Sequence, residues 1–517
     1  MGAAMTRAPD ILVIMVDQLN GTLFPDGPAP WLHTPNLDRI AERSARFANA
    51  YSSSPLCAPA RASFMSGCLP SRTGVYDNAA ELPSGVPSFA HHLRRAGYRT
   101  CLSGKMHFVG PDQLHGFEER RTTDVYPADF GWTPDYSRPG ERIDWWYHNL
   151  GSVTGAGIAE ITNQMEFDDE VAFHARQWLH QRARENDDPD RRPWCLTVSF
   201  THPHDPYVAR RELWELYEGC EQLMPEVGAL PWEALDPHSR RLMESFDYEH
   251  FRITDEDVMR SRRAYFANIS YLDAKVGEIC RVLEETRQAE NTVIVFTADH
   301  GDMLGSHGLW FKMSFREGSC RVPVMVAAPG LPAGRIDEPV SLLDVAPTLC
   351  DLAGVEMGAV APFVDGESLV PVAGGAPRSR AVPSEYAAEG SVAPMVMLRE
   401  GAFKLNLCEA DPPELYDLAS DPHELTNLAG DPAHGETFAR MKEEADRRWD
   451  LAAFDRAVRE SQARRHVVYE ALRNGRYWPW DFQPMQDAAD RYMRNHMDLN
   501  VVEERNRYPR FPQPPKP

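Results

Sequence analysis

Four clusters of polar residues each follow a short apolar run in the chain. Asp17, Gln18 and Asp299 supply oxygen atoms and His300 supplies a nitrogen, a set of ligands that suits a divalent cation. Lysine and histidine near such a cation would bind an anion coordinated to it. We therefore expect metal-assisted chemistry on an anionic substrate. The clusters are Asp17-Gln18, Gly104-Lys105-Met106-His107, His202-Pro203-His204-Asp205-Pro206 and Asp299-His300-Gly301-Asp302.

Each cluster taken alone also has a purely structural explanation. Asp17 could cap a helix, Lys105 could be a solvated surface lysine, and His204 could sit in a hydrogen-bonded turn. For any single cluster the structural explanation is favoured. The placement of all four after apolar runs is what favours a common site.

The apolar runs have the pattern of buried strands that alternate with amphipathic helices. Helices are expected over residues 89–96, 169–184 and 257–286, which favours a parallel sheet with helices on its faces. Ligands of such sheets bind at the carboxyl ends of the strands, where the polar clusters fall. The expected strands are residues 11–16, 98–102, 194–200, 292–297 and 322–327.

The texture of the sequence changes from about Glu385 onward. Residues 395–399 and 403–407 form a hairpin pattern around Glu400-Gly401, and a charged helical stretch and a proline-rich end follow Trp449. We expect three units: a large α/β catalytic domain at 1–380, a small α+β domain at 381–448, and an extension at 449–517. The aromatic residues of the extension should pack on its own domain or on a neighbouring subunit, which indicates roles in oligomerisation and active-site closure.

Composition excludes several classes of function. The 517 residues include 54 Lys and Arg against 77 Asp and Glu, a net charge of −23, which argues against nucleic acid or an anionic membrane as partner. No run reaches the ~20 apolar residues of a membrane span, and the run 11–16 lacks the flanks of a signal peptide. The nine cysteines include no Cys-x-x-Cys pair and suit reduced thiols. A cytoplasmic location is predicted.

One motif indicates the class of enzyme. Cys57-Ala58-Pro59-Ala60-Arg61 could be a buried free cysteine before a helix, but it resembles the signature of the type I sulfatases. The resemblance covers the whole chain. It implies an alkaline phosphatase-like mixed sheet sandwiched by helices, with a smaller C-terminal antiparallel domain and a tail. It also implies that a formylglycine-generating enzyme oxidises Cys57 to formylglycine, whose hydrate is the nucleophile.

The resemblance further implies a role for each polar cluster. A divalent cation, Ca²⁺ with Mn²⁺ or Mg²⁺ as alternatives, would lie between sulfate and nucleophile. Gln18 departs from the second aspartate of many sulfatases. Arg61 would hold the nucleophilic hydroxyl, His204 and Lys312 would protonate the leaving oxygen, and His107 would deprotonate the remaining hydroxyl. The implied catalytic residues are Cys57, Arg61, Lys105, His107, His204 and Lys312, and the implied metal ligands are Asp17, Gln18, Cys57, Asp299 and His300.

Three further stretches narrow the resemblance. Residues 110–117, 126–132 and 494–497 are similar to the branch of the family that cleaves choline O-sulfate. A trimethylammonium group donates no ordinary N–H bond, so aromatic faces and a carboxylate would recognise it. Core packing is about as good an explanation for any single aromatic residue. The substrate-binding candidates are Asn78, Trp132, Trp145, Trp146, Tyr126, Glu389, Glu385 and Asp498.

The aromatic residues of the tail indicate a homo-oligomer, a dimer or tetramer, in which Asp498 could reach the ammonium group bound by a neighbouring subunit.

The nearest rival function is hydrolysis of aryl sulfates or phosphonate monoesters by the same nucleophile. A rival of another class is a non-catalytic choline-binding protein with unmodified Cys57. A zinc phosphatase is disfavoured because no His-x-x-x-His spacing occurs.

Overall fold

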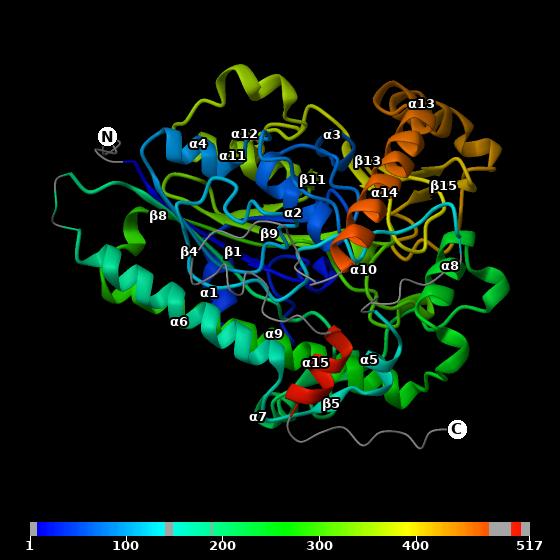
Figure 1. The fold of residues 1–517 in the computed structure, drawn as a ribbon, viewed down its shortest axis with the longest axis horizontal. Helices are drawn as coiled ribbons and strands as arrows, with labels where there is room; N and C mark the ends of the chain where they lie inside the picture. The colour runs from blue at the N-terminus through cyan, green and yellow to red at the C-terminus, as the bar shows by residue number, and fades with distance from the viewer. Residues whose placement is uncertain (1–7, 140–147, 187, 189, 475–497, 508–517) are drawn as a thin grey trace.

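A nine-stranded sheet forms the centre of the protein (Figure 1). The computed structural model describes residues 8–139, 148–186, 188, 190–474 and 498–507. The strand order is β10-β2-β9-β8-β1-β6-β3-β4, and β11 pairs with β2. The strands are β1 (Asp10–Val16), β2 (Ala45–Tyr51), β3 (Arg99–Gly104), β4 (Glu119–Arg120), β6 (Trp194–Ser199), β8 (Thr292–Ala298), β9 (Arg321–Ala327), β10 (Gly334–Ile336) and β11 (Val340–Ser341).

The middle of this sheet is parallel, as the strand and helix alternation predicts. β1 pairs with β6 on one side and β8 on the other, with Ile14 opposite Val198 and Phe296. All seven residues of β1 are buried. A strand covered on both faces needs apolar side chains on both faces, which explains the unbroken apolar run that marks β1 in the sequence.

The sheet is nevertheless mixed, as the family resemblance implies. β9 runs antiparallel to both β8 and β2. The apolar run of β9 predicts a strand but not its direction, because buried parallel and antiparallel strands share that composition. β2 was not predicted, since its sequence ARFANAY breaks its apolar pattern with Arg46 and Asn49.

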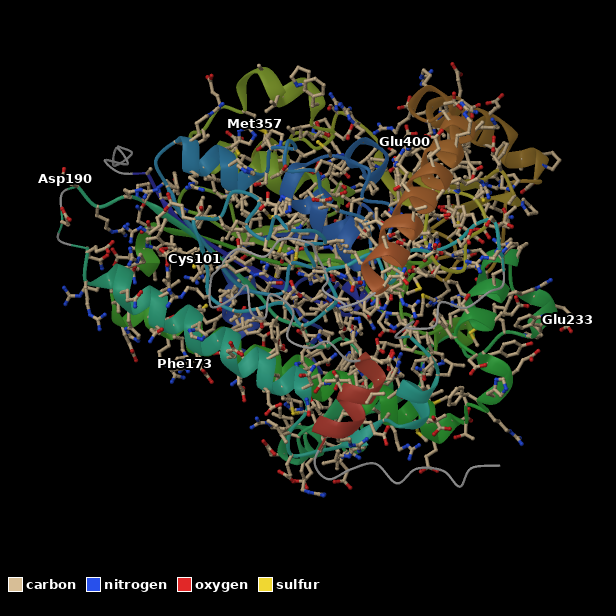
Figure 2. All side chains as sticks on the ribbon, viewed as in Figure 1. Cys101, Phe173, Asp190, Glu233, Met357 and Glu400 are labelled. Atoms are coloured by element: carbon tan, nitrogen blue, oxygen red, sulfur yellow. The ribbon has the colours of Figure 1, made fainter. Side chains whose placement is uncertain are left out.

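Helices cover both faces of the sheet (Figure 1). The 31-residue helix α9 begins with a capping box between Thr254 and Asp257. Phe173 lies on the outer face of α6 and is 52% exposed, whereas Trp178 of the same helix is fully buried (Figure 2). One face carries α2 (Cys57–Ser66), α3 (Pro70–Thr73), α4 (Phe89–Arg95), α11 (Val345–Leu352) and α12 (Leu369–Ala373), and the other carries α1 (Pro35–Glu42), α6 (Asn163–Ala183) and α9 (Asp255–Glu285).

Short elements fill the long connections between these layers. β5 and β7 form a small parallel pair. These elements are α5 (Gly151–Thr154), β5 (Gly157–Ile158), β7 (Val208–Ala209), α7 (Arg211–Glu215), α8 (Pro237–Ser245) and α10 (Glu317–Cys320).

A second, four-stranded antiparallel sheet follows the main one, in the order β12-β13-β14-β15. The predicted hairpin is confirmed, with Glu400 paired to Phe403 across its turn. Helices α13 and α14 lie beside this sheet, and α15 lies apart from it near α5 and β5 (Figure 1). The elements are β12 (Val382–Tyr386), β13 (Met395–Glu400), β14 (Phe403–Cys408), β15 (Asp411–Asp417), α13 (Gly435–Arg448), α14 (Leu451–Arg473) and α15 (Leu499–Asn506).

Two further observations concern the chain as a whole. In the part of the chain that the structure describes, none of the helices combines the length and the apolar character needed to cross a bilayer. All nine cysteines lie in that part and are free thiols.

Candidate active site

The sheet brings the four polar clusters to one edge. β3, β6, β1 and β8 are parallel neighbours, so the loops after their carboxyl ends lie side by side. The main-chain N–H of Gln18 donates to Asp299 Oδ1 at 3.0 Å. Lys105 forms an ion pair with Asp17, and His204 Nε2 lies 3.9 Å from Asp17 Oδ1. Residues from all four clusters are thus in contact.

Cys57 opens helix α2 inside this group of loops and is 1% exposed. Its Sγ atom lies 3.2 Å from His300 Nε2 and 3.9 Å from Asp17 Oδ1. Burial alone would raise the pKa of the thiol, but the positive charges of Lys105 and Lys312 outweigh it and hold the pKa well below its usual value. The thiolate is the reactive form of cysteine, so the charges around position 57 favour the reactive form of this residue.

A buried group of possible metal ligands surrounds Cys57. Asp17, Cys57, Asp299 and His300 offer ligand atoms that all lie within 4.8 Å of one another. Buried carboxylates side by side repel each other unless positive charge lies between or beside them. Two carboxylates, an imidazole and an oxygen at position 57 therefore fit a divalent cation.

Gln18 lies in the same loop, but its side chain makes hydrogen bonds away from this group. Lys312 Nζ donates to Gln18 Oε1 at 2.6 Å, and Gln18 Nε2 donates to Asp302 Oδ2 at 2.6 Å. Burial raises the pKa of Asp302 to about 6, against the hydrogen bonds that the carboxylate accepts. The role of Gln18 as a metal ligand stays a prediction.

Arg61 connects the loops around Cys57 through hydrogen bonds. Its Nε donates to Asp299 Oδ2 at 2.8 Å, and Nη2 donates to Asp17 Oδ2 at 3.0 Å. Nη1 donates to the Lys105 carbonyl oxygen at 2.7 Å and to Ser199 Oγ at 2.8 Å. Arg61 is fully buried, and these charge-assisted bonds compensate its desolvation. In this arrangement its guanidinium orients the two carboxylates that flank Cys57.

Lys312 and His204 form a pair on the other side of the site. Lys312 Nζ lies 2.7 Å from His204 Nε2, and His204 Nδ1 lies 2.7 Å from the Asp205 carbonyl oxygen. Two nitrogen atoms at such a distance share one hydrogen, since one of them must accept. The pair can therefore hold and release a proton at a defined place.

Aromatic rings lie against these polar groups. Lys105 Nζ lies 3.8 Å from the centroid of the Tyr126 ring. The Trp132 ring lies 5.7 Å from that of Tyr126 and 5.9 Å from that of His107, between ring centroids. Tyr126 and Trp132 are thus beside the proposed sulfate-binding groups.

The two candidate carboxylates for the ammonium group differ sharply. Glu385 accepts hydrogen bonds of 2.6 Å from Ser71 N, Ser71 Oγ and Trp449 Nε1. Glu389 is 7% exposed, and neither of its carboxylate oxygens has a hydrogen-bond partner among the described residues. Burial raises the pKa of Glu389 well above its usual value, while Lys312 acts on it in the opposite direction. Glu385 is structurally engaged, whereas Glu389 is available to a ligand.

The other candidates have separate positions. Asn78 Oδ1 accepts from the main-chain N–H of Ala58, in the first turn of α2, at 2.9 Å. Asp498 caps α15 through the N–H of Val501 at 3.2 Å. Trp145 and Trp146 lie outside the described residues.

Sequence reasoning missed several residues that shape the site, and Asp124 is one of them. Asp124 Oδ2 accepts from the main-chain N–H groups of Met106 and His107, at 3.0 and 2.9 Å. His107 has a positive φ of 53°, a strained value for a residue with a side chain, so the turn needs such support. In the sequence, Asp124 is notable only because Arg120 lies four residues before it, and such a spacing does not indicate a functional residue.

A cleft of about 1270 Å³ lies elsewhere, between the main sheet and the small sheet. Its lining includes Asn20, Trp31, Arg262 and His423 but neither Cys57 nor Glu389. Cavity size therefore does not locate the chemistry in this protein.

Comparison with known proteins agrees with this geometry. The family profile described as Sulfatase matches residues 9–355, which is more than half of the chain. The chain belongs to the sulfatase family. Two further profiles match later parts of this sulfatase. The profile described as N-sulphoglucosamine sulphohydrolase, C-terminal, matches residues 305–449, and the profile described as Choline sulfatase enzyme C terminal matches residues 456–508.

Individual relatives show which sulfatases this chain is similar to. It is 67% identical over 508 residues to the choline-sulfatase of Rhizobium meliloti (strain 1021), covering 98% of this chain and 99% of the relative. It is 29% identical over 408 residues to the iduronate 2-sulfatase of Mus musculus, covering 68% and 70%. The crystal structure of the phosphonate monoester hydrolase of Agrobacterium radiobacter has a TM-score of 0.66 at 23% identity, covering 84% and 94%, which is a likeness of fold.

Proposed function

We propose that this sulfatase hydrolyses choline O-sulfate to choline and sulfate. The observation that carries the proposal is Glu389, a buried carboxylate with no hydrogen-bond partner among the described residues, within electrostatic range of Lys312. An unpaired buried carboxylate is costly in a folded protein unless a cation pairs with it in use. The identity to a choline-sulfatase over nearly the whole chain supports the same substrate.

The family implies a divalent metal and formylglycine, and the residues around position 57 fit both. Asp17, Asp299 and His300 would hold the metal together with an oxygen at position 57. The metal would lower the pKa of a bound hydroxyl and neutralise sulfate charge. The hydrated aldehyde at position 57 would supply the nucleophilic oxygen.

The surrounding side chains then have separate tasks. Lys105, paired with Asp17, places positive charge where sulfate oxygens would lie. The Lys312 and His204 pair would donate its shared proton to the departing choline oxygen. His107, held by the turn that Asp124 supports, would remove the proton that returns position 57 to its starting state.

We propose Ca²⁺ as the metal, with Mn²⁺ and Mg²⁺ as alternatives. Two of the four candidate ligands are carboxylates and a third would be the oxygen at position 57, which favours a hard cation. Elemental analysis of the purified protein tests this choice. Zinc or another soft metal at about one equivalent per subunit would contradict it.

Recognition of the ammonium group would combine aromatic faces with Glu389. Tyr126 and Trp132 lie together next to His107 and His204. Faces of such rings attract a quaternary ammonium that cannot donate an N–H bond. Trp145, Trp146 and Asn78 complete the proposed pocket, while Glu385 serves the protein's own structure.

We further propose a cytoplasmic homo-oligomer, a dimer or tetramer, that is matured by a formylglycine-generating enzyme. In this proposal the chain has catalytic, small and extension units at 1–380, 381–448 and 449–517. The extension joins subunits, and Asp498 reaches the ammonium site of a neighbour. Removing residues from 475 onward should lower the number of subunits in analytical ultracentrifugation. An unchanged assembly would contradict this role for the extension.

The direct test of function compares substrates. The protein, produced with a formylglycine-generating enzyme, should hydrolyse choline sulfate with a kcat/KM far above that for an aryl sulfate or a phosphonate monoester. A preference for the aryl sulfate or the phosphonate would favour the rival hydrolase function. Mass spectrometry of the Cys57 peptide addresses the other rival, because an intact thiol in such cells would indicate a choline-binding protein without catalysis.

A further inference from the structure

Helix α14 of the C-terminal extension lies against a loop of the catalytic domain that begins at Trp132. Gln462 Oε1 accepts from the main-chain N–H of Tyr136 at 3.0 Å, and His466 Nε2 lies 3.2 Å from the Pro134 carbonyl oxygen. Arg465 lies on the same face of α14 and is only 6% exposed. A long cationic side chain this deeply buried requires polar partners.

Arg465 finds those partners in two loops. Its Nη1 and Nη2 atoms donate to the two carboxylate oxygens of Asp77, each at 2.6 Å. Nη1 also donates to Thr133 Oγ1 at 3.0 Å. Asp77 immediately precedes Asn78, and Thr133 immediately follows Trp132. One guanidinium therefore fixes the neighbours of two residues that would line the ammonium pocket.

The chain of contacts continues to the nucleophile. Asn78 accepts a hydrogen bond from the main-chain N–H of Ala58, the residue after Cys57. Asp77 also donates no hydrogen bonds of its own when ionised, so its orientation depends on the groups that donate to it. Arg465, together with the main-chain N–H of Ala79, thus orients Asp77, and through it the segment that contacts the start of α2.

Charge gives Arg465 a second effect on the same region. Glu389 is buried, and both burial and the nearby Asp77 carboxylate raise its pKa, whereas Arg465 lowers it. In the ion pair, Asp77 and Arg465 carry no net charge together. Arg465 therefore favours the ionised form of Glu389, the form that could pair with a cationic ligand, and neither Glu389 oxygen has a hydrogen-bond partner among the described residues.

We propose that Arg465 is a positioning residue that sets the selectivity of the site for the sulfate esters of cationic alcohols. The inference rests on the proposed function and extends it to α14. Arg465 acts through Asp77 and Thr133, so it should affect recognition of the ammonium end more than the cleavage of the sulfate ester. A helix that only braced the fold would affect all substrates alike.

The experiment compares Arg465→Gln with Arg464→Gln, on choline sulfate and on 4-nitrophenyl sulfate. Arg464 is the matched control because its side chain is 74% exposed and lies 3.9 Å from Glu460 at the surface. Arg465→Gln should lower kcat/KM for choline sulfate about 30-fold, chiefly by raising KM, and that for the aryl sulfate less than about threefold. Arg464→Gln should leave both values unchanged.

Two further variants separate charge from shape. Arg465→Lys keeps the positive charge but cannot form the paired bonds to Asp77, so it should recover only part of the lost kcat/KM for choline sulfate. Asp77→Asn combined with Arg465→Gln removes both charges and should recover part of it, because no uncompensated carboxylate remains. If Arg465→Gln alone does not fold, these two variants provide the comparison. An equal loss for both substrates in any of these variants would overturn the inference.

Failure of the proposed function is distinguishable from failure of this inference. A wild-type protein that does not prefer choline sulfate would refute the proposed function. Inhibition of aryl sulfate hydrolysis by choline then still tests Arg465. The inhibition constant should rise about tenfold in Arg465→Gln relative to Arg464→Gln. An unchanged constant would overturn the role of Arg465.

Discussion

The sulfate end and the ammonium end of the candidate site are built in different ways. At the sulfate end, Asp17, Asp299, Arg61 and Lys105 are fully buried and paired with one another. At the ammonium end, the Glu389 carboxylate is almost as buried but has no hydrogen-bond partner among the described residues. The charged groups of one end are already paired within the protein, whereas the other end holds a carboxyl group that lacks a hydrogen-bond partner among the described residues and would ionise more readily beside a cationic substrate.

The two ends of the site come from different parts of the sequence. The sulfate end comes from loops after the strands of the main sheet, together with the start of α2, all within the segment that matches the sulfatase profile. The ammonium end combines loops with β12 and its following turn, and α14 supports it. In the proposed function, the segment that matches the family profile would carry the reaction, and the part of the chain from β12 onward would contribute to selectivity.

The most severe way to break the sulfate end is Cys57→Ala. We expect turnover to fall at least about 10⁴-fold, because in the proposed mechanism the oxygen nucleophile derives from this residue. Thermal unfolding should be little changed, since alanine suits the first turn of a buried helix. Turnover and the melting temperature are measured on the same preparation. Activity above about 1% of wild type would exclude Cys57 as the source of the nucleophile.

Removal of the metal should be the next largest effect. Exhaustive chelation should lower turnover at least about 100-fold and lower the melting temperature, because Asp17 and Asp299 would lose a counter-charge. Adding back Ca²⁺, Mn²⁺ or Mg²⁺ separately identifies the cation that restores both properties. Full activity in a protein shown to be metal-free by elemental analysis would contradict the metal site.

Glu389→Gln tests the ammonium end alone. Loss of a buried charge that pairs with a cation costs about 2–3 kcal/mol, so kcat/KM for choline sulfate should fall about 100-fold. Hydrolysis of an aryl sulfate, whose leaving group carries no cation, should change less than about threefold. Glu385→Gln is the matched comparison, because Glu385 is equally buried but already accepts three hydrogen bonds. A larger selective loss in Glu385→Gln would reverse the assignment of the two carboxylates.

The effect expected to be smallest on activity is a change in the pH dependence of stability. Burial raises the pKa of Glu385 to about 7 despite the hydrogen bonds from Ser71 and Trp449, whereas the group titrates near 4.5 when unfolded. The native state therefore binds an extra proton between these values, and stability from this group is lost as the pH rises through that window. The change amounts to about 3 kcal/mol.

Chemical denaturation at several pH values checks this prediction. Glu385→Gln should make the free energy of unfolding less dependent on pH between about 4.5 and 7. A profile parallel to that of the wild type would show that Glu385 does not titrate in this range.

Much of the fold and of the sulfate end could be predicted from the sequence. Buried strands such as β1 and β8 have continuous apolar runs, and each is followed at once by polar residues. The direction of β9 could not be predicted, because antiparallel neighbours in the interior of a sheet have no distinct composition. Local patterns therefore identify elements better than they identify pairings.

The ammonium end was harder to predict for a physical reason. Glu385 and Glu389 are four residues apart and alike in type, and only their partners distinguish them. Ser71, Trp449 and Arg465 are remote in sequence from the groups that they bind. Contacts of this kind depend on tertiary packing and leave no trace in periodicity or composition.

The burial of α2 has a consequence for the proposed maturation of the protein. All ten residues of this helix are buried, and Cys57 is at its first position beneath the loops that Arg61 fastens. The formylglycine-generating enzyme of the proposed maturation would have to bind this segment and oxidise its thiol, and in the folded protein the segment is buried. In the proposed maturation, conversion of Cys57 to the aldehyde would therefore come before the chain folds, and a subunit that folds with an intact thiol would lack the proposed nucleophile.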